Sequence, residues 1–279
     1  MKLANIGCGK VIRKEWINLD LFPSSSEVIK CDITKGLPFQ DNTIDACYSS
    51  HVLEHLTPDD GKNFLAEQFR VLKSGGIIRV VVPDLENICS NYLAQLHADE
   101  QGNDQAVSCR HYYSVLEVVD QLTRHETGGQ IMKFWKTCGD EGRDYVAERN
   151  GMEALEGMRR AQNSGQPNKP PPRSSIREKI GDLLSDAGFA LLSKLKKRNV
   201  QDCYNLGVFR LSGEVHRFMY DSLLLRDFLR AAGFSDIRKV ESCLSAIPSF
   251  PAYQLDEMNG VKRKPESLYM EARKICLVP

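Results

Sequence analysis

Short apolar runs alternate with glycine and polar residues over the first 83 positions. The five runs are Leu3–Ile6, Trp16–Leu19, Val28–Cys31, Ile44–Tyr48 and Ile77–Val82. Between the fourth and fifth runs the spacing becomes helical, because Leu65, Phe69 and Leu72 fall on one helical face. The fifth run is almost continuously apolar, which is typical of a central parallel strand covered on both faces. Strands alternating with helical connections predict a doubly wound α/β sheet.

Boundary signals place two of the helices. Thr57 followed by Pro58 resembles a helix N-cap with proline at the first helical position, and Ser74-Gly75-Gly76 would end that helix. Asp221 is a second N-cap candidate, for a helix that Gly233 closes. The runs Ile237–Ser242 and Leu268–Leu277 follow it and would complete a seven-stranded sheet.

The 127 residues from 86 to 212 interrupt this alternation. They read as a mostly helical insertion between the fifth strand and the last helix, with Val115, Val118, Val119 and Leu122 on one face. Residues 164–175 are rich in proline and predict an exposed loop. We therefore expect residues 1–85 and 213–279 to form one domain and the insertion to form the substrate or lid region.

Composition excludes several classes of protein. The 279 residues are 42% hydrophobic and 27% charged, which is ordinary for a globular chain. The 37 Lys and Arg balance 37 Asp and Glu, which argues against a protein that coats nucleic acid. There is no apolar run near the roughly 18 residues of a membrane span, and the first residues lack a signal-peptide stretch. Nine cysteines without a C-x-x-C pair favour a reduced, cytoplasmic chain with mostly buried thiols.

The turn Gly7-Cys8-Gly9 after the first strand could let a nucleotide approach the backbone. A tight turn is the simpler interpretation. A dinucleotide fingerprint needs a third glycine or alanine where Ile12 stands, and the short distance to Asp20 leaves little room for a pyrophosphate-binding helix. The pattern disfavours NAD and FAD and suits a nucleoside cofactor without phosphate.

Two acids follow the second and third predicted strands. Asp20 could accept hydrogen bonds from both ribose hydroxyls, and Asp32 could receive an adenine amino group beside Ile33. Either alone is more often a turn residue or a helix cap. Together with the glycine turn they predict a site at the carboxyl ends of successive strands.

Several segments resemble class I S-adenosylmethionine-dependent methyltransferases of the type-11 group. The resemblance is carried by IGCG, INLD, CDI, LPFQDNTIDACYSSHVLEHL and RVLKSGGIIRVVVPDLE, and it returns in HRFMYDSLLLRDFLRAAGFSDIRKV. The phrases VVDQLTRHETGGQIMKFW and KPESLYMEARK are similar to methyltransferases of bacterial polysaccharide and glycan clusters. The resemblance implies a Rossmann-like sheet with a terminal antiparallel hairpin, S-adenosyl-L-methionine as cofactor and S-adenosyl-L-homocysteine as product.

The same resemblance assigns roles to individual residues. It places Asn5, Gly7, Cys8 and Gly9 at the methionine and ribose side of the cofactor, with Asp20 and Leu21 at the ribose. Asp32 and Ile33 would lie at the adenine, and Ser49, Ser50 and His51 at the methyl-transfer end. Two departures are visible. Asn5 stands where the family often has an acid that pairs with the cofactor ammonium, and no helices precede the first strand, so the insertion would have to form the lid.

The segment from His51 to His55 spells H-x-x-E-H, the inverted zinc-peptidase signature. Such a site needs both histidines on one helix face and a further ligand downstream. No downstream placement is compelling, and the segment coincides with the L-E-H of the methyltransferase pattern. We expect Glu54 and His55 to cap and pack a helix, and we expect no metal.

Methyl transfer to a hydroxyl calls for a general base. His51 is the first candidate and His216 the second, with Tyr220 and Asp221 behind them; a packing role is an equal alternative for both histidines. The chain has no N/D-P-P-Y motif after the fourth strand, no Pro-Cys pair and no acidic cluster suggesting Mg²⁺.

We therefore expect a cytoplasmic methyltransferase that O-methylates a sugar or glycan intermediate. The alternatives are a methyltransferase acting on another small metabolite and a catalytically silent cofactor-binding module. Its partner would be a small-molecule or glycan acceptor and not nucleic acid, and the sequence leaves the oligomeric state open. Residues 180–198 form an amphipathic pattern ending in four cations, which could contact a membrane surface but more simply faces the protein core.

Overall fold

The structure is a computed structural model that describes residues 1–100, 105–163, 188, 190–191, 193–194 and 199–275. Seven strands form its main sheet, in the spatial order β3-β2-β1-β4-β5-β9-β6. They are β1 (Leu3–Ile6), β2 (Ile17–Asp20), β3 (Val28–Lys30), β4 (Ile44–Ser50), β5 (Leu72–Pro83), β6 (Ser235–Lys239) and β9 (Ser267–Arg273). Strands β1 to β5 pair in parallel, whereas β9 is antiparallel to both β5 and β6. The predicted α/β sheet with a terminal antiparallel hairpin is confirmed.

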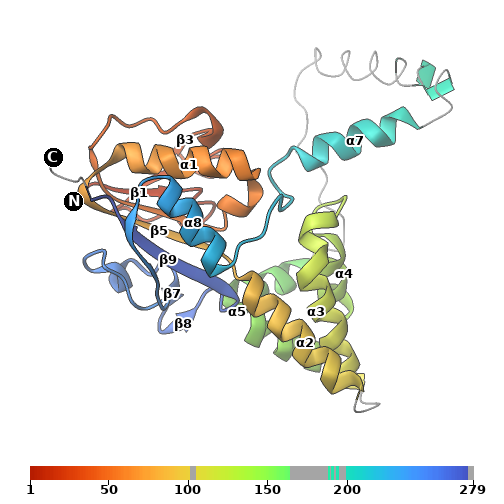
Figure 1. The fold of residues 1–279 in the computed structure, drawn as a ribbon. Helices are drawn as coiled ribbons and strands as arrows, with labels where there is room; N and C mark the ends of the chain where they lie inside the picture. The colour runs from red at the N-terminus through yellow and green to blue at the C-terminus, as the bar shows by residue number, and fades with distance from the viewer. Residues whose placement is uncertain (101–104, 164–187, 189, 192, 195–198, 276–279) are drawn as a thin grey trace.

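Two helices cover one face of this sheet, α1 (Pro58–Val71) and α8 (Ser222–Ala231) (Figure 1). Their buried side chains, such as Phe64, Leu65 and Leu229, pack with the strands into one apolar cluster. At ~1.5–3 kcal/mol for each large side chain removed from water, this burial is the main force holding the helices to the sheet.

The opposite face is covered by irregular chain, whereas a doubly wound sheet usually carries helices on both faces. No helix joins β1 to β2 or β2 to β3, and only the short η1 (Ile33–Lys35) joins β3 to β4. The cover comes instead from the connection between β6 and β9, which contains η3 (Phe250–Tyr253), β7 (Glu257–Met258) and β8 (Val261–Lys262). Trp16 packs edge-on against Tyr48 and Phe250 there.

The helix-start signal at Thr57 is confirmed, because its side chain accepts a hydrogen bond from the Asp60 backbone N–H. The predicted helix end is wrong by two residues. The helix stops at Val71, where Leu72 turns extended and pairs with Ile44 of β4. Ser74-Gly75-Gly76 therefore lies at the start of β5, so strand pairing and not the glycines ends the helix.

The apolar fifth run contains a fully buried arginine. Arg79 has no exposed surface, and its guanidinium donates to the carboxylates of Asp256 at 2.7 Å and Glu271 at 2.8 Å. It also donates to three backbone carbonyls between residues 241 and 244. Arg79 thus ties the centre of β5 to the irregular cover of the sheet.

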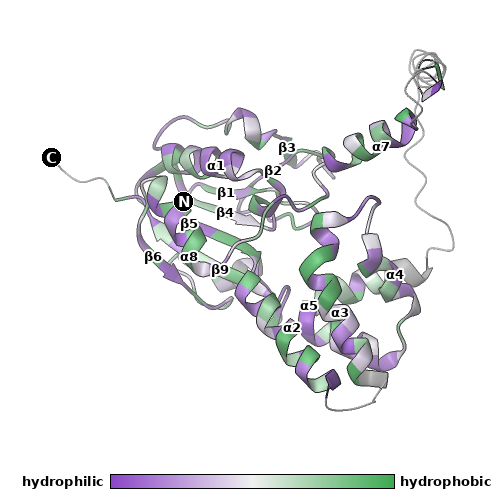
Figure 2. Ribbon diagram, turned by 45° about the vertical axis from the view of Figure 1, so that its right-hand side comes forward, coloured by the Kyte–Doolittle hydropathy of each residue, from purple (hydrophilic) through white to green (hydrophobic). Residues whose placement is uncertain are grey.

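The segment between β5 and α8 is mostly helical where the structure describes it. Its helices are α2 (Leu85–Glu100), α3 (Gln105–Thr123), α4 (Gly129–Thr137), α5 (Asp140–Asn163) and α7 (Val200–Arg210). Figure 2 shows α2, α3 and α5 packed side by side, away from the sheet. Helices α3, α4 and α5 enclose a separate apolar cluster that includes Tyr113, Leu116, Phe134 and Tyr145.

The face of α3 that carries the valines is not its most buried face. Val119 is 41% exposed, whereas the buried face carries Tyr113, Leu116, Glu117 and Asp120. The two acids are buried because each has a partner. The Asp120 carboxylate accepts from the Gln130 backbone at the start of α4, and Glu117 pairs with an arginine of α5. Apolar spacing alone therefore selects the wrong side of this helix.

Two segments predicted from the sequence cannot be compared with the structure. The proline-rich loop 164–175 and most of the amphipathic segment 180–198 lie outside the described residues. None of the helices within the described ranges is long and apolar enough to cross a membrane. The expectation of mostly buried thiols is wrong for the cysteines described, since only Cys8, Cys31 and Cys47 are buried.

Candidate active site

The turn after β1 is held by β2. Gly7 and Gly9 adopt left-handed backbone angles with φ of 70° and 53°. The backbone N–H groups of Gly7 and Cys8 donate to the Leu19 carbonyl, and the Gly9 N–H donates to the Asp20 carboxylate at 2.8 Å. A Cβ at Gly7 would collide with Val52, whereas a Cβ at Gly9 would meet no atom within 4 Å. The turn is therefore closed on one side and open on the other.

Asn5 holds the same turn from inside. Its side-chain amide donates to the Val11 carbonyl at 2.9 Å and to the Asn18 side-chain oxygen at 3.0 Å, and the residue is only 2% exposed. Burial and the nearby Asp20 carboxylate raise the pKa of the Cys8 thiol to about 11, so this cysteine stays protonated at neutral pH. Neither side chain brings charge to the turn.

Asp32 stands at the end of β3 as the N-cap of η1. Its carboxylate accepts from the Thr34 backbone and hydroxyl and pairs with Lys35 at 2.9 Å. The hydrogen bonds from Lys35 and then Thr34 lower the pKa of Asp32. An ionised hydrogen-bond acceptor is thus fixed beside Ile33 at the sheet edge, where the sequence predicts an adenine contact.

Two cavities adjoin the glycine turn. We name the first, of about 360 Å³, the turn cavity; its wall includes Asn5, Gly7, Cys8, Gly9, Ser50 and His51. We name the second, of about 820 Å³, the strand-end cavity; its wall includes Gly7, Gly9, Asp20, Leu21, Asp32, Ile33 and His51. Every cofactor residue expected from the sequence therefore lines one of the two cavities, except Ser49. That side chain is 1% exposed, its hydroxyl has no partner, and it lines neither cavity.

The two cavities fit S-adenosylmethionine. Carboxylates at the ends of β2 and β3 can accept from ribose hydroxyls and an adenine amino group, and the open side of Gly9 leaves room for a ligand against the backbone. No phosphate site is needed, which agrees with the missing helix between β1 and β2.

A third cavity, of about 390 Å³, lies between the sheet and the insertion, and we name it the insertion cavity. Its wall includes Tyr113, Glu117, Gln121, Ile131, Trp135 and Asn150 from the insertion, together with His51 and Lys264. None of these insertion residues was expected individually from the sequence, although Gln121, Ile131 and Trp135 fall in the quoted segment VVDQLTRHETGGQIMKFW. His51 is the residue that the turn, strand-end and insertion cavities share.

His51 is held in an unusual backbone conformation with φ of 54°. Its imidazole Nε2 lies 2.8 Å from the Ser267 hydroxyl, and Nδ1 lies 3.4 Å from a Glu54 oxygen. Burial, followed by the positive charge of Lys264, holds the pKa of His51 well below its usual value. The ring is therefore neutral at pH 7 and can accept a proton.

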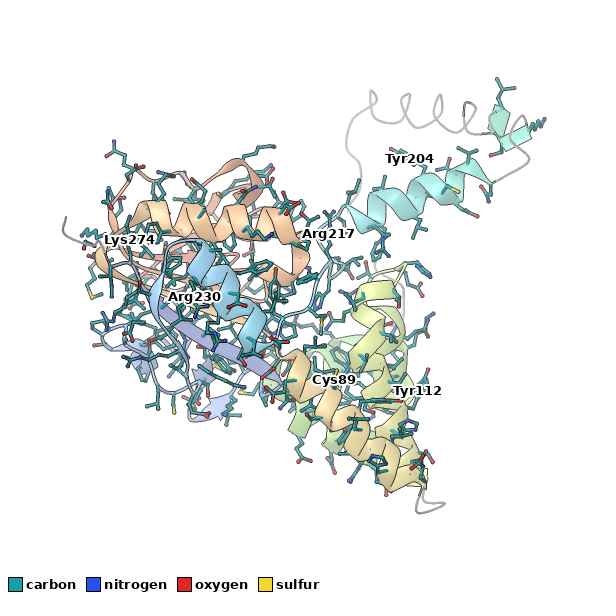
Figure 3. The ribbon with its side chains drawn as sticks, in the orientation of Figure 1. Cys89, Tyr112, Tyr204, Arg217, Arg230 and Lys274 are labelled. Atoms are coloured by element: carbon teal, nitrogen blue, oxygen red, sulfur yellow. The ribbon has the colours of Figure 1, made fainter. Side chains whose placement is uncertain are left out.

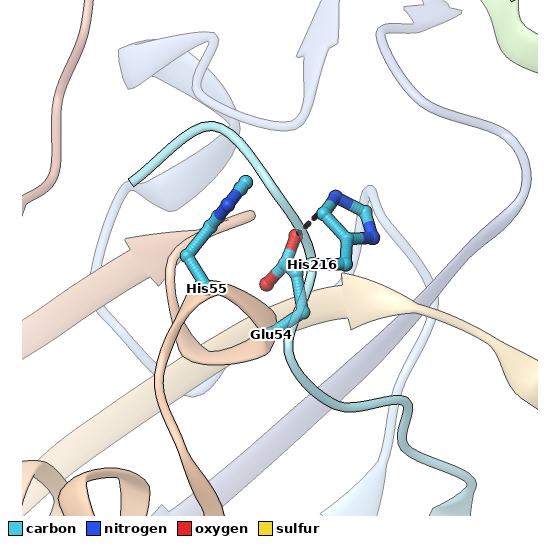
Figure 4. A group of neighbouring side chains, drawn as sticks. All are labelled: Glu54, His55 and His216. Carbon is cyan, nitrogen blue, oxygen red and sulfur yellow. Dashed lines mark ion pairs between the residues drawn. The ribbon is translucent and has the colours of Figure 1, made fainter. Parts of the chain in front are cut away.

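Figure 4 shows the polar cluster behind His51, formed by Glu54, His55 and His216. His216 Nε2 lies 4.0 Å from a Glu54 oxygen, and the two imidazole rings meet edge to face at 4.7 Å. Burial raises the pKa of Glu54 to about 8 and lowers that of His55 to about 4, so both groups are neutral at pH 7. His216 is 3% exposed and lines none of the three named cavities.

This cluster does not fit a zinc ion as it stands. Its three ligand atoms lie within 4.8 Å of one another, whereas tetrahedral zinc with bonds near 2.1 Å holds its ligands about 3.4 Å apart. Arg124 and Lys264 also act on both histidines with positive charge. The H-x-x-E-H segment is not an α-helix, because His51 is left-handed and only Leu53–His55 forms a short 3-10 turn. Its two histidines therefore do not share a helix face.

Tyr220 and Asp221, the weaker base candidates, have structural roles. Asp221 caps α8 by accepting from the Leu224 backbone at 2.8 Å, and Tyr220 is fully buried beside Phe218 and Phe228. Arg217, labelled in Figure 3, lies where the chain returns from α7 to the sheet, and it lines the strand-end cavity.

The site also contains charged residues that were not expected from the sequence. Glu153, Glu156 and Arg160 of α5 reach the turn cavity, as do Arg263 and Lys264 from the loop before β9. They lie more than 140 positions from the glycine turn, and among them only Lys264 belongs to a segment that carries the resemblance, KPESLYMEARK. Only the packing of α5 against this loop brings them there.

Comparison with known proteins places this site in context. Residues 6–80 match the family described as methyltransferase domain. No curated protein matches the chain. The solved structures that are similar to it include three methyltransferases. One is an S-adenosylmethionine-dependent methyltransferase of Thermotoga maritima, which is described as a possible histamine N-methyltransferase. It is 13% identical to this chain, the match covers 98% of this chain and 82% of that chain, and the TM-score is 0.38. One of Archaeoglobus fulgidus is 13% identical, with 98% and 86% covered and a TM-score of 0.39. One of Mesorhizobium loti is 14% identical, with 98% and 90% covered and a TM-score of 0.38.

The matched residues run from the end of β1 into β5. They include the glycine turn, both strand-end acids and His51, which are the groups that line the turn and strand-end cavities. The match to a methyltransferase domain over residues 6–80 indicates an S-adenosylmethionine-dependent methyltransferase, and the sheet has the class I α/β fold.

Proposed function

We propose that the protein transfers a methyl group from S-adenosylmethionine to a hydroxyl of a sugar or glycan intermediate. The observation that carries this proposal is the position of His51, which lines the two cavities suited to the cofactor and the cavity in the insertion. The methyl-transfer end of the cofactor would then lie next to the insertion cavity, which we assign to the acceptor. The insertion, residues 86–212, would be the substrate region.

The wall of the insertion cavity suits a polyhydroxylated acceptor. The Tyr113 hydroxyl donates to Asn150 at 2.7 Å, and the Asn150 amide donates to Glu117 at 3.1 Å. The indole N–H of Trp135 lies 3.4 Å from the Tyr113 hydroxyl. Sugars present hydroxyls that both donate and accept, so a wall of carboxylate, amide and phenol groups beside an apolar ring face matches their chemistry.

The cofactor, when bound, supplies a methyl group on a sulfonium that a nucleophile displaces in line. The two acids at the strand ends would hold the adenosine part and so fix the reacting end near His51, and such orientation can supply several kcal/mol of the barrier. Asp20 and Asp32 are suited to this because each is already held by backbone N–H groups.

His51 would act as the general base. Its neutral imidazole would take the proton of the acceptor hydroxyl as the oxygen–methyl bond forms and the methyl–sulfur bond breaks, which leaves S-adenosylhomocysteine and a methyl ether. The Ser267 hydroxyl is hydrogen-bonded to Nε2 and a Glu54 oxygen lies 3.4 Å from Nδ1, and an acceptor hydroxyl would replace Ser267 at Nε2. His216 would contribute by packing, since it lines none of the three cavities.

The test is transfer of a labelled methyl group to a panel of free sugars, nucleotide sugars, lipid-free oligosaccharides and small amines. We expect label in a sugar, as an ether that survives mild base. His51→Asn is the matched variant, because asparagine tolerates the left-handed backbone but cannot take the proton. It should keep cofactor affinity and lose about 10²–10⁴-fold in turnover.

Other outcomes identify the competing functions. Label in amines alone would contradict the sugar assignment and favour another small metabolite. Calorimetric cofactor binding without transfer to any member of the panel would favour a silent binding module. An Asp20→Ala variant that binds the cofactor as the parent does would contradict the assigned cofactor site.

A further inference from the structure

The methionine end of the cofactor is a zwitterion, with an ammonium and a carboxylate on one carbon. A site that binds it selectively needs a partner for each charge. The glycine turn brings no negative side chain, because the residue two positions before Gly7 is Asn5, whose amide is already bonded to Val11 and Asn18. The carboxylate of Asp20 is bonded to the turn's own backbone. The negative partner must come from elsewhere on the wall of the turn cavity.

Helix α5 brings charged side chains to this cavity through a kink. Gly151, in the middle of the helix, has a non-helical backbone with φ of 67° and ψ of −153°. A Cβ there would lie 2.8 Å from the carbonyl oxygens of Lys262 and Arg263 and 2.7 Å from Pro265. Only glycine combines this angle with so close an approach. The kink therefore sets the second half of α5 against the loop before β9.

Ion pairs hold the second half of α5 in that position. Glu153, one turn or less beyond the kink, pairs with Arg263 at 3.0 Å and with Lys264 at 3.5 Å. One turn further on, Glu156 and Arg160 reach the turn cavity and pair with each other at 2.9 Å. The cavity thus has a wall from the glycine turn and a charged wall from the insertion.

Among the carboxylates on this wall, Glu156 is the one free to accept a new cation. Asp256 is bonded to Arg79 and Tyr48, and Glu153 is shared by two cations of the loop. Glu156 has only Arg160 as an ion-pair partner within the described residues, and its side chain is 53% exposed. Arg160, 61% exposed, is likewise able to meet a carboxylate.

We propose that α5 of the insertion supplies the charged partners of the methionine zwitterion, with Glu156 meeting the ammonium and Arg160 meeting the carboxylate. This rests on the cofactor site and not on the identity of the acceptor. The insertion then takes part in holding the cofactor, in place of the acid that the turn lacks. The same helix lines the insertion cavity with Asn150, Glu153 and Ala154, so it forms a common wall of the cofactor and acceptor sites.

The experiment measures calorimetric affinities of the full-length protein for three nucleosides. S-adenosylhomocysteine carries both charges of the amino-acid tail, decarboxylated S-adenosylmethionine lacks the carboxylate, and 5′-methylthioadenosine lacks the tail. Glu156→Gln should weaken the first two by about fivefold to tenfold and leave methylthioadenosine within twofold. Arg160→Gln should weaken only S-adenosylhomocysteine.

Glu148→Gln is the matched control, because it removes the same charge from an exposed site on α5 that does not line the cavity. It should leave all three affinities unchanged. The proposal is overturned if Glu156→Gln binds S-adenosylhomocysteine like the parent, or if it loses methylthioadenosine to the same degree. Failure of the parent to bind any of the three nucleosides would instead contradict the cofactor assignment itself.

Discussion

Arg79 carries its positive charge in a fully buried position. A guanidinium without solvent contact is stable in β5 only because two carboxylates and three carbonyls receive its donors. Its guanidinium also lies over the aromatic rings of Phe250, at 4.5 Å, and Tyr269, at 5.5 Å. Such a group adds little net stability while complete, but its removal leaves two buried carboxylates without their cation.

We therefore expect Arg79→Met to lower the free energy of unfolding by about 3–5 kcal/mol, as for other buried pairs that lose one member. Urea denaturation followed by circular dichroism would measure the change. Arg226→Met on the exposed surface of α8 is the control and should stay within about 0.5 kcal/mol of the parent. A change below 1 kcal/mol for Arg79→Met would mean that the network is not formed.

Glu54 makes stability depend on pH. Its pKa is raised by burial to about 8, above the ordinary value of 4.5. A carboxyl group with a raised folded-state pKa gives up a proton more readily when unfolded, so it destabilises the fold as pH rises from about 4.5 to 8. By pH 8 the loss from this group is on the order of 2–4 kcal/mol.

Glu54→Gln should remove that dependence. The variant should gain stability relative to the parent as pH rises from 5 to 9, and the gain should level off above the folded-state pKa of about 8. Glu266, whose pKa is also raised, to about 7, is present in both proteins and adds its own pH dependence to each. Melting temperatures at half-unit pH steps would measure the difference; a gap that stays constant over this range would contradict the raised pKa.

Among the elements, α8 begins at Asp221, a residue that the sequence suggests both as a helix cap and as a candidate base. Asp221 begins the helix by accepting from Leu224, and a lost cap of this kind costs about 1 kcal/mol. We expect Asp221→Ala to lose this amount and to keep the affinity for S-adenosylhomocysteine, with Asp221→Ser restoring most of the stability. Thermal unfolding would measure the stability of each variant, and calorimetry would measure its affinity for S-adenosylhomocysteine. If Asp221→Ala lost more free energy of binding than free energy of unfolding, Asp221 would again be a candidate for the site.

Elements were predictable from the sequence where local physics sets them. Thr57 and Pro58 start α1, and the glycine turn follows β1, because caps and left-handed turns depend on a few neighbouring residues. The end of α1 was not predictable from Ser74-Gly75-Gly76, since pairing of Leu72 with Ile44 decides it. The buried face of α3 was missed for a similar reason: the partners of Glu117 and Asp120 come from other helices.

At the scale of the whole molecule, the sheet and the insertion have separate apolar clusters. Phe134 belongs to the cluster of the insertion, where it packs against Tyr113. Phe134→Ala should destabilise that cluster by about 3–5 kcal/mol. We expect hydrogen exchange to rise in α3, α4 and α5 and to stay slow in β1, β4 and β5, because local opening follows cooperative units. A uniform rise across both parts would show instead that the molecule unfolds as one unit.

The sequence by itself determined the order of the elements, the glycine turn, the acids at the strand ends and the position of His51. These depend on short-range backbone preferences and on the rule that parallel strands end at one edge of a sheet. Only the tertiary structure decided what surrounds them. Arg79 meets Asp256 across 177 positions and Glu271 across 192, and α5 meets the glycine turn through a kink and a loop that share no motif with it. Contacts of this kind depend on how whole elements pack, and packing is a property of three-dimensional shape that residue spacing along the chain does not encode.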